Sequence, residues 1–260
     1  MEDKMIPKVI HYCWFGRSPL PELAEKCIES WKKYCPDYEI IEWNETNFDI
    51  NCCEYVREAY EAKKWAFVSD VARLYVLINY GGIYMDTDVE VVRPLDDLLI
   101  YIAVSGFESE TRIPTGLMGS CAKQELFKEF LDGYKNAHFK RHDGSLDLTT
   151  NVTRITDHCL KYGLQLNNSI QTIKGFTLLP YDYLCPKNFE TGELKITENT
   201  FCIHHFDGSW HTEEEIFANR LAVKMEKVPG GSYLAKFIGV IKYRGVLAAM
   251  GETLGWIKRM

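Results

Sequence analysis

The residues with the clearest capacity for chemistry are two carboxylates one residue apart, Asp86 and Asp88 in the segment IYMDTDVEVV. This segment, residues 83–92, is rich in β-branched residues and predicts a strand that ends at Pro94. Side chains alternate along a strand, so both carboxylates are expected on one face. Two such groups repel each other unless a cation lies beside them, and hard oxygen ligands suit Mg²⁺ or Mn²⁺. The motif predicts a divalent-metal site that could hold a diphosphate, although a solvated edge strand could also carry two acids.

A second pair, Asp70 and Arg73, lies three residues apart on the predicted helix that precedes this strand. Residues three apart share one face of a helix, so these two side chains are expected to meet. An ordinary helical ion pair is the simplest interpretation of this spacing. The spacing alone therefore does not distinguish an ion pair from a binding site.

A third candidate is the block IHHFDGSW at residues 203–210. Neighbouring residues on a strand point to opposite faces, so only one of His204 and His205 can readily join a given metal site. Histidine favours transition ions and makes Mn²⁺ a better fit than Mg²⁺. Trp210 offers an indole N–H that could reach a phosphate oxygen. A surface strand with aromatic packing is the other interpretation of this block.

Trp14 is the fourth candidate, at the end of the predicted strand over residues 8–15. An aromatic ring at that position could stack on a nucleobase, a contact worth roughly 1–3 kcal/mol. Burial of the ring in the core is the alternative.

The elements that must position these residues begin with a strand–helix–strand unit. Apolar residues recur at helical spacing over residues 21–35, between the strand at 8–15 and a second predicted strand at 38–43. Such a unit predicts a parallel sheet with right-handed crossovers. Ligands of open α/β sheets bind at the carboxyl ends of the strands, where Asp86 and Asp88 are expected to lie.

The remaining elements are less regular. The pattern over residues 53–80 predicts two helices, and the Gly81–Gly82 pair is expected to end the second one. Farther along, Gly, Pro and Asn separate short predicted elements: helices over 123–137 and 152–162, and strands near 176–180 and 200–206.

Composition excludes several classes of protein. The 260 residues are 46% hydrophobic and 26% charged, which excludes wholesale disorder. The net charge of −7 argues against a general nucleic-acid coat, which needs a basic surface. The nine cysteines form no CxxC pair, so a zinc site is not expected. The first residues lack a signal-peptide pattern and no apolar run of about 20 residues is present, so we expect a cytoplasmic protein.

The last part of the chain differs in charge. Residues 220–260 carry eight Lys and Arg against two Glu, and two apolar helical stripes follow the Pro-Gly-Gly of residues 229–231. We therefore expect a catalytic domain over residues 1–228 and a basic, amphipathic helical tail over residues 229–260. Docking on the anionic inner face of a membrane is one interpretation of the tail. A helical subdomain packed on the catalytic domain, or a dimer contact, is the other.

Taken together, these blocks resemble the family 32 glycosyltransferases with the DxD sugar-binding region, which include bacterial enzymes of capsular and surface polysaccharide synthesis. The most specific segment is SDxxRxxxLxxxGGxYxDxD at residues 69–88, and the resemblance covers roughly residues 6–110 and 200–211. Residues 111–199 match only loosely. The resemblance implies an α/β class of GT-A type, a Rossmann-like sheet for a nucleotide-sugar with a divalent ion at the DxD.

The resemblance also implies a role for each candidate. Trp14 would stack on the base, and Asp70 and Arg73 would hold the sugar hydroxyls. Asp86 would contact ribose, sugar and metal, and Asp88 would ligate the metal. His205 would be a further metal ligand, and His204 is the alternative if the alignment is shifted by one residue. Trp210 would donate a hydrogen bond to the diphosphate.

The expected activity is a retaining, metal-dependent transfer with Mn²⁺ or Mg²⁺. It would move a hexose or N-acetylhexosamine from a UDP-sugar to a hydroxyl of a surface polysaccharide or a lipid-linked glycan. A GDP-mannose donor is the alternative within the family. Two further classes stay open: a phosphohydrolase with a DxD strand, which normally needs Thr or Val where Glu90 stands, and a sugar-nucleotide-binding protein without catalysis.

Overall fold

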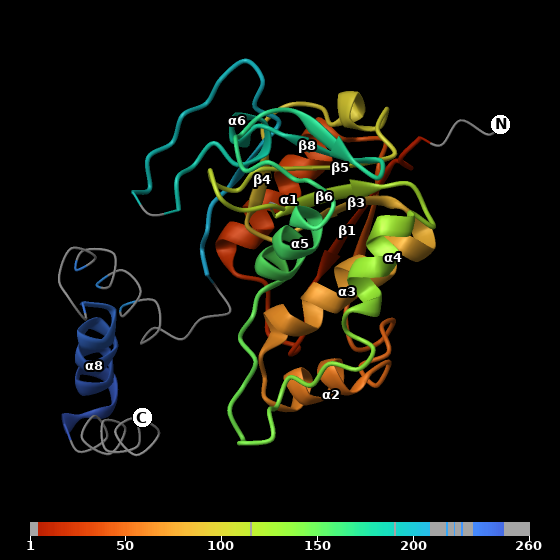
Figure 1. Ribbon diagram of the computed structural model, residues 1–260. Coiled ribbons are helices and arrows are strands. Elements are labelled where there is room, and N and C mark those ends of the chain that lie inside the picture. Colours follow the sequence, from red (N-terminus) through yellow and green to blue (C-terminus); the bar gives the residue numbers. More distant parts are fainter. Residues whose placement is uncertain are drawn as a thin grey trace. The chain divides into compact units, whose positions relative to one another are not determined.

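The computed structural model describes residues 5–114, 116–189, 191–208, 217, 221, 225 and 231–246 (Figure 1). The chain divides into two compact units, Met1–Phe206 and Asp207–Met260. The boundary predicted at residue 228 falls inside the second unit, at residues outside the described ones. In that unit, helix α8 (Gly231–Arg244) occupies the first predicted stripe, and the second stripe lies outside the described residues. No helix in the described part is both long and apolar enough to cross a bilayer.

The first unit is built on a seven-stranded mixed sheet with the order β2-β1-β3-β6-β5-β8-β7. Strands β1, β2 and β3 run parallel, as do β5 and β8, whereas β6 and β7 are antiparallel to their neighbours. A second, two-stranded sheet pairs β4 with β9 in antiparallel fashion. The strands are β1 (Val9–Cys13), β2 (Glu39–Trp43), β3 (Gly82–Met85), β4 (Val89–Val91), β5 (Ala103–Gly106), β6 (Leu117–Ser120), β7 (Gln171–Ile173), β8 (Phe176–Leu179) and β9 (Cys202–His204).

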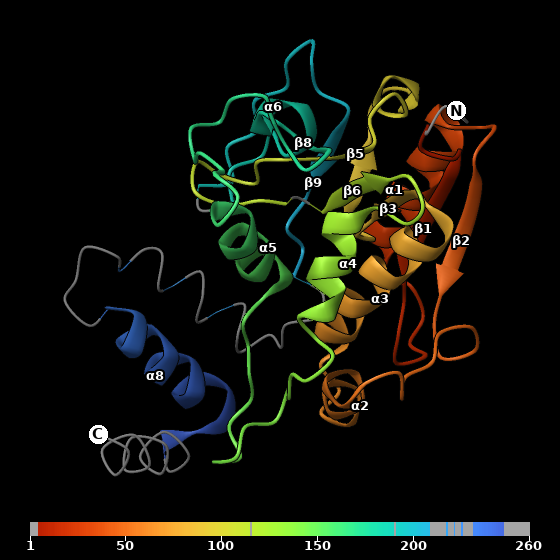
Figure 2. The same ribbon diagram turned by 45° about the vertical axis from the view of Figure 1, so that its right-hand side comes forward.

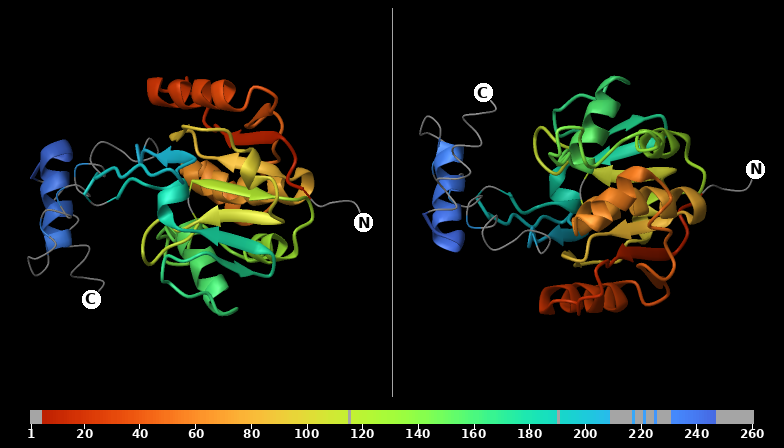
Figure 3. Two further views of the ribbon diagram at one scale, coloured as in Figure 1. Left: turned by 90° about the horizontal axis from the view of Figure 1, so that it is seen from above. Right: turned by 90° about the horizontal axis from the view of Figure 1, so that it is seen from below.

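Helices cover both faces of the sheet. In Figure 3, α3 lies behind the strands in the left view and in front of them in the right view, so it covers one face of the sheet. Helix α1 packs with Ile10 and Ile83, which point to the other face. Figure 2 shows α3, α4 and α5 side by side, in agreement with the contacts between successive members of this group. The helices are α1 (Glu22–Tyr34), α2 (Glu54–Glu61), α3 (Trp65–Tyr80), α4 (Glu125–Asp132), α5 (Asn151–Leu160) and the short α6 (Tyr181–Leu184), with a 3₁₀ turn at Asp96–Leu98.

Two apolar cores hold these layers. Buried residues of α3, including Val68, Val71 and Leu74, lie in the larger core with residues of α2, α4 and α5. The smaller core joins α1 to β4 and β9. There the indole of Trp31 is fully buried and donates a hydrogen bond to the Val89 carbonyl at 2.7 Å. Helix α1 therefore fixes the strand that directly follows the two carboxylates.

The α/β class and the predicted strand–helix–strand unit are confirmed, and so are the two helices between residues 53 and 80. The helices predicted over 123–137 and 152–162 are present as the shorter α4 and α5. The predicted single strand over residues 83–92 is wrong, because it stops at Met85 and resumes as β4 at Val89. Strands β5, β6 and β7 were not predicted from the sequence.

Candidate active site

Asp86 and Asp88 lie in the turn between β3 and β4 rather than on a strand. The Asp86 N–H donates to the Gly116 carbonyl at 2.8 Å, and the Val89 N–H donates to the Asp86 carbonyl at 3.0 Å. The expectation that strand alternation puts both carboxylates on one face therefore does not apply. Each carboxylate instead has its own partner, Arg73 for Asp86 and His204 for Asp88.

Arg73 is the partner of Asp86. Its Nη2 atom lies 3.0 Å from Asp86 Oδ1 and 3.3 Å from Asp70 Oδ1. Asp86 also accepts a 3.1 Å hydrogen bond from the Tyr84 hydroxyl, and the guanidinium carbon lies 4.6 Å from the centre of the Tyr84 ring. The predicted meeting of Asp70 and Arg73 on one face of α3 is confirmed. One buried cation therefore serves two carboxylates from different elements.

Asp70 is buried behind Arg73 and is also held by the start of α5. The Asn151 N–H donates to Asp70 Oδ2 at 3.1 Å, and the Asn151 side-chain amide donates to the Asp70 carbonyl at 3.1 Å. Burial raises the pKa of Asp70 to about 6, an effect that Arg73 and the Asn151 N–H offset only in part. Asn151 lies in the stretch that the family motifs match only loosely, so sequence reasoning gave no signal for it.

His204 is the partner of Asp88. Its Nε2 atom lies 3.3 Å from Asp88 Oδ1, because β4 and β9 pair with Val89 opposite His204. Burial disfavours the imidazolium, but the attraction of Asp88 prevails and raises the pKa of His204 well above its usual value. The ring stacks on Phe206 with 4.1 Å between centroids. His204 therefore contributes to the second carboxylate's site.

His205 points elsewhere. Its Nε2 atom lies 2.8 Å from Glu90 Oε2, and its backbone N–H donates to the Asp88 carbonyl at 3.0 Å. This is the opposite-face arrangement expected of adjacent histidines. Of the two alternatives left open by the sequence, the geometry favours His204 as the residue next to Asp88.

Gly116 lies close both to Asp86 and to His204, the partner of Asp88. A Cβ atom added at Gly116 would lie 3.1 Å from Asp86 Oδ2, 3.2 Å from His204 Cε1 and 2.9 Å from a Val89 methyl. Only a residue without a side chain fits between these groups. Glu108, which follows β5, also belongs to this cluster, because burial raises its pKa and its charged neighbours include His204, Asp86 and Arg73. Glu108 lies within the range that the family resemblance covers, but no role was predicted for it.

The donor set fits a divalent ion that a bound diphosphate helps to hold. Among the described residues, no three His, Cys, Asp or Glu side chains form a ready-made metal cluster. Asp88 and His204 supply one carboxylate oxygen and one imidazole nitrogen, while Arg73 occupies Asp86. Mg²⁺ and similar ions are commonly bound by one or two carboxylates together with substrate phosphates. The residues present therefore suit a site that is completed by the substrate.

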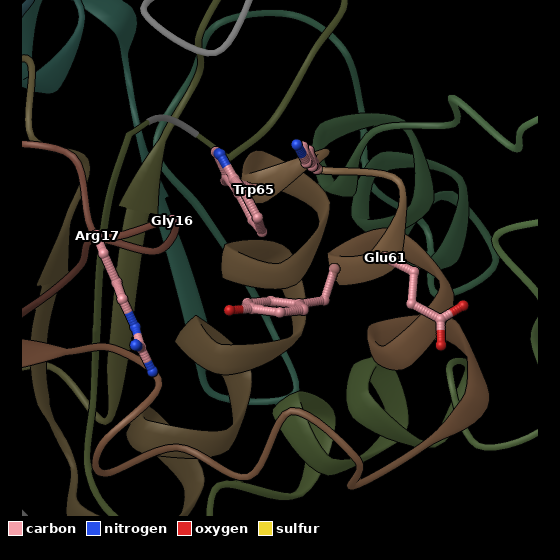
Figure 4. A pocket seen from close by; sticks show the side chains of 6 residues that line it. Gly16, Arg17, Glu61 and Trp65 are labelled. Carbon is pink, nitrogen blue, oxygen red and sulfur yellow. The ribbon is translucent and has the colours of Figure 1, made fainter.

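Trp14 and its loop lie at the same edge of the sheet as Asp86, because β1 runs parallel to β3 and both end there. The Trp14 indole donates to the Ser18 carbonyl at 2.6 Å, and its ring is half-buried. A pocket of about 500 Å³ opens beside this loop (Figure 4). Its lining residues are Gly16, Arg17, Tyr60, Glu61, Lys63 and Trp65. Trp210, the remaining candidate, lies outside the described residues.

Comparison with known proteins agrees with this arrangement. Residues 21–104 match the family described as "Glycosyltransferase sugar-binding region containing DXD motif", a range that includes Asp70, Arg73, Asp86 and Asp88. Inositol phosphoceramide mannosyltransferase 3 of Schizosaccharomyces pombe is 33% identical over 130 residues, which cover 45% of this chain and 34% of that protein. Mannosyl phosphorylinositol ceramide synthase SUR1 of Saccharomyces cerevisiae is 29% identical over 147 residues, with coverages of 52% and 36%.

The matched region spans about a third of the length of these two relatives. A solved structure, described as a glycosyltransferase involved in the glycosylation of the major capsid of PBCV-1, superposes with a TM-score of 0.45 at 11% identity. That superposition covers 84% of this chain and 100% of the other. Residues 21–104 therefore carry a glycosyltransferase sugar-binding region of the DXD type, and its acidic residues gather around Arg73 and His204.

Proposed function

We propose that this chain is a metal-dependent glycosyltransferase that moves a sugar from a nucleoside diphosphate to an acceptor hydroxyl. The observation that carries the proposal is the position of Arg73 between Asp70 and Asp86, with Asp88 and His204 paired nearby. Carboxylates held by fixed partners are suited to accept hydrogen bonds from sugar hydroxyls. The adjacent carboxylate–imidazole pair is suited to a divalent ion with a diphosphate.

We favour mannose from GDP-mannose as the donor over the UDP-sugar expected from the sequence. Support comes from the relatives, two of which carry names that describe mannosyl transfer. UDP-hexoses and UDP-N-acetylhexosamines are the second candidate donors, because one hydroxyl inversion changes only a contact or two in a sugar site. The acceptor would be a hydroxyl of a glycan or of a lipid-linked glycan.

In the proposed reaction, the bond between the sugar C1 and the diphosphate breaks and C1 bonds to the acceptor oxygen. A bound divalent ion would supply a Lewis acid for the leaving diphosphate. Arg73 is buried and positively charged, so it favours negative charge that develops nearby. Asp70 and Asp86 orient the sugar. We propose retention of configuration through a front-face reaction, in which the departing phosphate oxygen takes the acceptor proton. A covalent glycosyl–enzyme adduct would contradict this route.

A phosphohydrolase that uses the first Asp of a DxD motif as its nucleophile is less consistent with these contacts. Asp86 Oδ1 already accepts from both Arg73 and Tyr84. A binding protein without catalysis shares every contact described, so turnover must distinguish it. Release of free nucleotide from a sugar nucleotide would exclude the binding-only alternative.

The first test is thermal stabilisation by GDP-mannose, UDP-galactose, UDP-glucose and UDP-N-acetylglucosamine, each with Mn²⁺, Mg²⁺ or EDTA. A ligand at a hundred times its Kd adds about 2.7 kcal/mol to the free energy of unfolding. We expect stabilisation by GDP-mannose with Mn²⁺ that disappears with EDTA and in Asp88→Asn. Asp97→Asn, at an exposed acid, is the matched control and should respond as the wild type does. A lack of response to every nucleotide would contradict the proposal.

We also propose that the C-terminal unit docks on an anionic membrane surface. Helix α8 supports this, since it combines exposed Tyr233 and Leu234 with the basic residues Lys242 and Arg244 in its last turn. Co-sedimentation of the full chain with vesicles that contain phosphatidylserine should fall when Lys242 and Arg244 are both changed to Gln. Equal binding by both proteins would contradict this role for the helix.

A further inference from the structure

The first turn of α5 contacts one carboxylate oxygen of Asp70, and Arg73 contacts the other. Asp70 Oδ1 contacts Arg73, and Asp70 Oδ2 accepts from the Asn151 backbone N–H. The N-cap Thr150 accepts from the Thr153 N–H and so satisfies another free donor of the helix end. The Asn151 N–H is thus directed at a carboxylate, where the positive end of the helix dipole favours negative charge.

The Asn151 side chain adds a second attachment. It is 3% exposed, and its Nδ2 atom donates to the Asp70 carbonyl at 3.1 Å. One residue therefore holds Asp70 at both its carboxylate and its backbone. Because these contacts join α5 to α3, they fix the direction of the carboxylate relative to Arg73 and Asp86.

A cavity with several polar side chains in its lining borders Asn151. It has a volume of about 170 Å³, lies between α4 and α5, and is lined in part by Tyr134, Asn151 and Arg154. Three atoms of these side chains are buried and make no hydrogen bond with another described residue: Asn151 Oδ1, the Tyr134 hydroxyl and Arg154 Nε. Buried polar groups normally find a partner, and a cavity with several of them suits ordered water.

We propose that Asn151 is a positioning residue for Asp70 in sugar transfer, supported by a hydrated cavity that it lines. The inference rests on the proposed function, in which Asp70 contacts the donor sugar. Asn151 acts through Asp70 and does not itself touch the nucleotide. Its loss should therefore weaken recognition of the sugar and leave recognition of the nucleotide diphosphate almost unchanged.

The test compares two affinities in each variant, those for GDP with Mn²⁺ and for GDP-mannose with Mn²⁺, measured by calorimetry. If the wild type prefers a UDP-sugar, the two ligands are that UDP-sugar and UDP. In Asn151→Ala we expect about a tenfold loss of affinity for the sugar nucleotide, and less than about a twofold change for the free nucleotide. The value of kcat/KM for transfer should fall by at least the same factor.

Thr150→Ala is the matched control. It removes the helix cap one residue away and weakens α5, but it leaves both Asn151 contacts with Asp70 in place. We expect it to change both affinities by less than about twofold. Asn151→Ser serves as a second variant if Asn151→Ala does not fold, since serine suits the start of a helix.

Three results would overturn the inference. Equal losses for nucleotide and sugar nucleotide in Asn151→Ala would mean a general structural role. An equally selective loss in Thr150→Ala would assign the effect to helix stability. Failure of the wild type to bind any sugar nucleotide would remove the proposed function itself, and this outcome is recognised before any variant is made.

Discussion

Arg73 Nη2 and Asp86 Oδ1 lie 3.0 Å apart, although one residue belongs to α3 and the other to the turn after β3. The Arg73 side chain is 10% exposed, and the same nitrogen also contacts Asp70. This contact joins the helix to the turn at the sheet edge where nucleotides bind in open α/β folds. It also explains how Asp86 and Asp88 can lie close in sequence, since the charge of Asp86 is already matched.

Loss of the Arg73 cation should destabilise the fold strongly. In Arg73→Met, two carboxylates would stay buried without their partner, and we expect a loss of about 3–5 kcal/mol in the free energy of unfolding. The measurement is denaturant unfolding followed by circular dichroism at pH 7. Arg57→Met is the matched control, because Arg57 also serves two acids, Glu54 and Glu61, but on an exposed helix face. It should cost less than about 1 kcal/mol, and a similar loss in both variants would contradict a special role for Arg73.

The pKa of Asp70 predicts a pH dependence of stability with an unusual direction. Burial raises this pKa to about 6, against about 4 in an unfolded chain. Between these values the folded state binds more protons than the unfolded state, so the contribution of Asp70 is complete below pH 4 and is lost as pH rises through 6. The loss amounts to about 2–3 kcal/mol at pH 7.

The measurement is the unfolding free energy of the wild type and of Asp70→Asn at pH 4 and pH 7. Other titrating groups contribute equally to both proteins. Between pH 4 and pH 7, the unfolding free energy of the wild type should therefore fall by about 2–3 kcal/mol more than that of the variant. Catalysis should change in the opposite direction, since the ionised carboxylate accepts stronger hydrogen bonds from the sugar hydroxyls than the protonated carboxyl does. Parallel pH curves for the two proteins would show that Asp70 is not perturbed.

His204, the last residue of β9, and His205, which follows it, should differ in how much they affect the metal dependence of nucleotide binding. His204 contacts Asp88, whereas His205 contacts Glu90. We expect His204→Gln to reduce the gain in GDP affinity from Mn²⁺ by about 10–100-fold. His205→Gln, a matched change one residue away, should retain most of that gain. Calorimetry of GDP with and without Mn²⁺ measures both, and the reverse order would restore the assignment of His205 expected from the family resemblance.

The sequence was most informative where one element determines the geometry. The spacing of Asp70 and Arg73 on a regular helix predicted their contact, and the strand–helix–strand pattern predicted the parallel pairing of β1 with β2. It failed at the DxD because β-propensity over residues 83–92 does not reveal the turn at Asp86, which is fixed by the hydrogen bond to Gly116. Asn151 and Glu108 reach the site through tertiary contacts with distant segments, and no local periodicity encodes such contacts.

Gly16, in the loop after β1, allows a test of whether close packing against Trp65 is needed to form the pocket beside Trp14. Gly16 has a φ of +90°, and a Cβ atom there would lie 2.6 Å from the Trp65 ring. Its N–H donates to Glu45, which also accepts from the Tyr60 hydroxyl. Gly16→Ala must therefore strain the backbone and displace Trp65, a residue that lines the pocket.

Gly144→Ala separates these two effects. Gly144 has a similar φ of +82°, but no atom lies within 4 Å of a Cβ built there. We expect Gly144→Ala to cost about 1–2 kcal/mol from the left-handed backbone alone and to leave nucleotide affinity unchanged. Gly16→Ala should cost more and should also weaken binding of the free nucleotide, because the loop carries Trp14 at the edge of the sheet. Unfolding and nucleotide calorimetry measure the two effects, and equal results for both variants would show that contact with Trp65 is not needed to form the pocket.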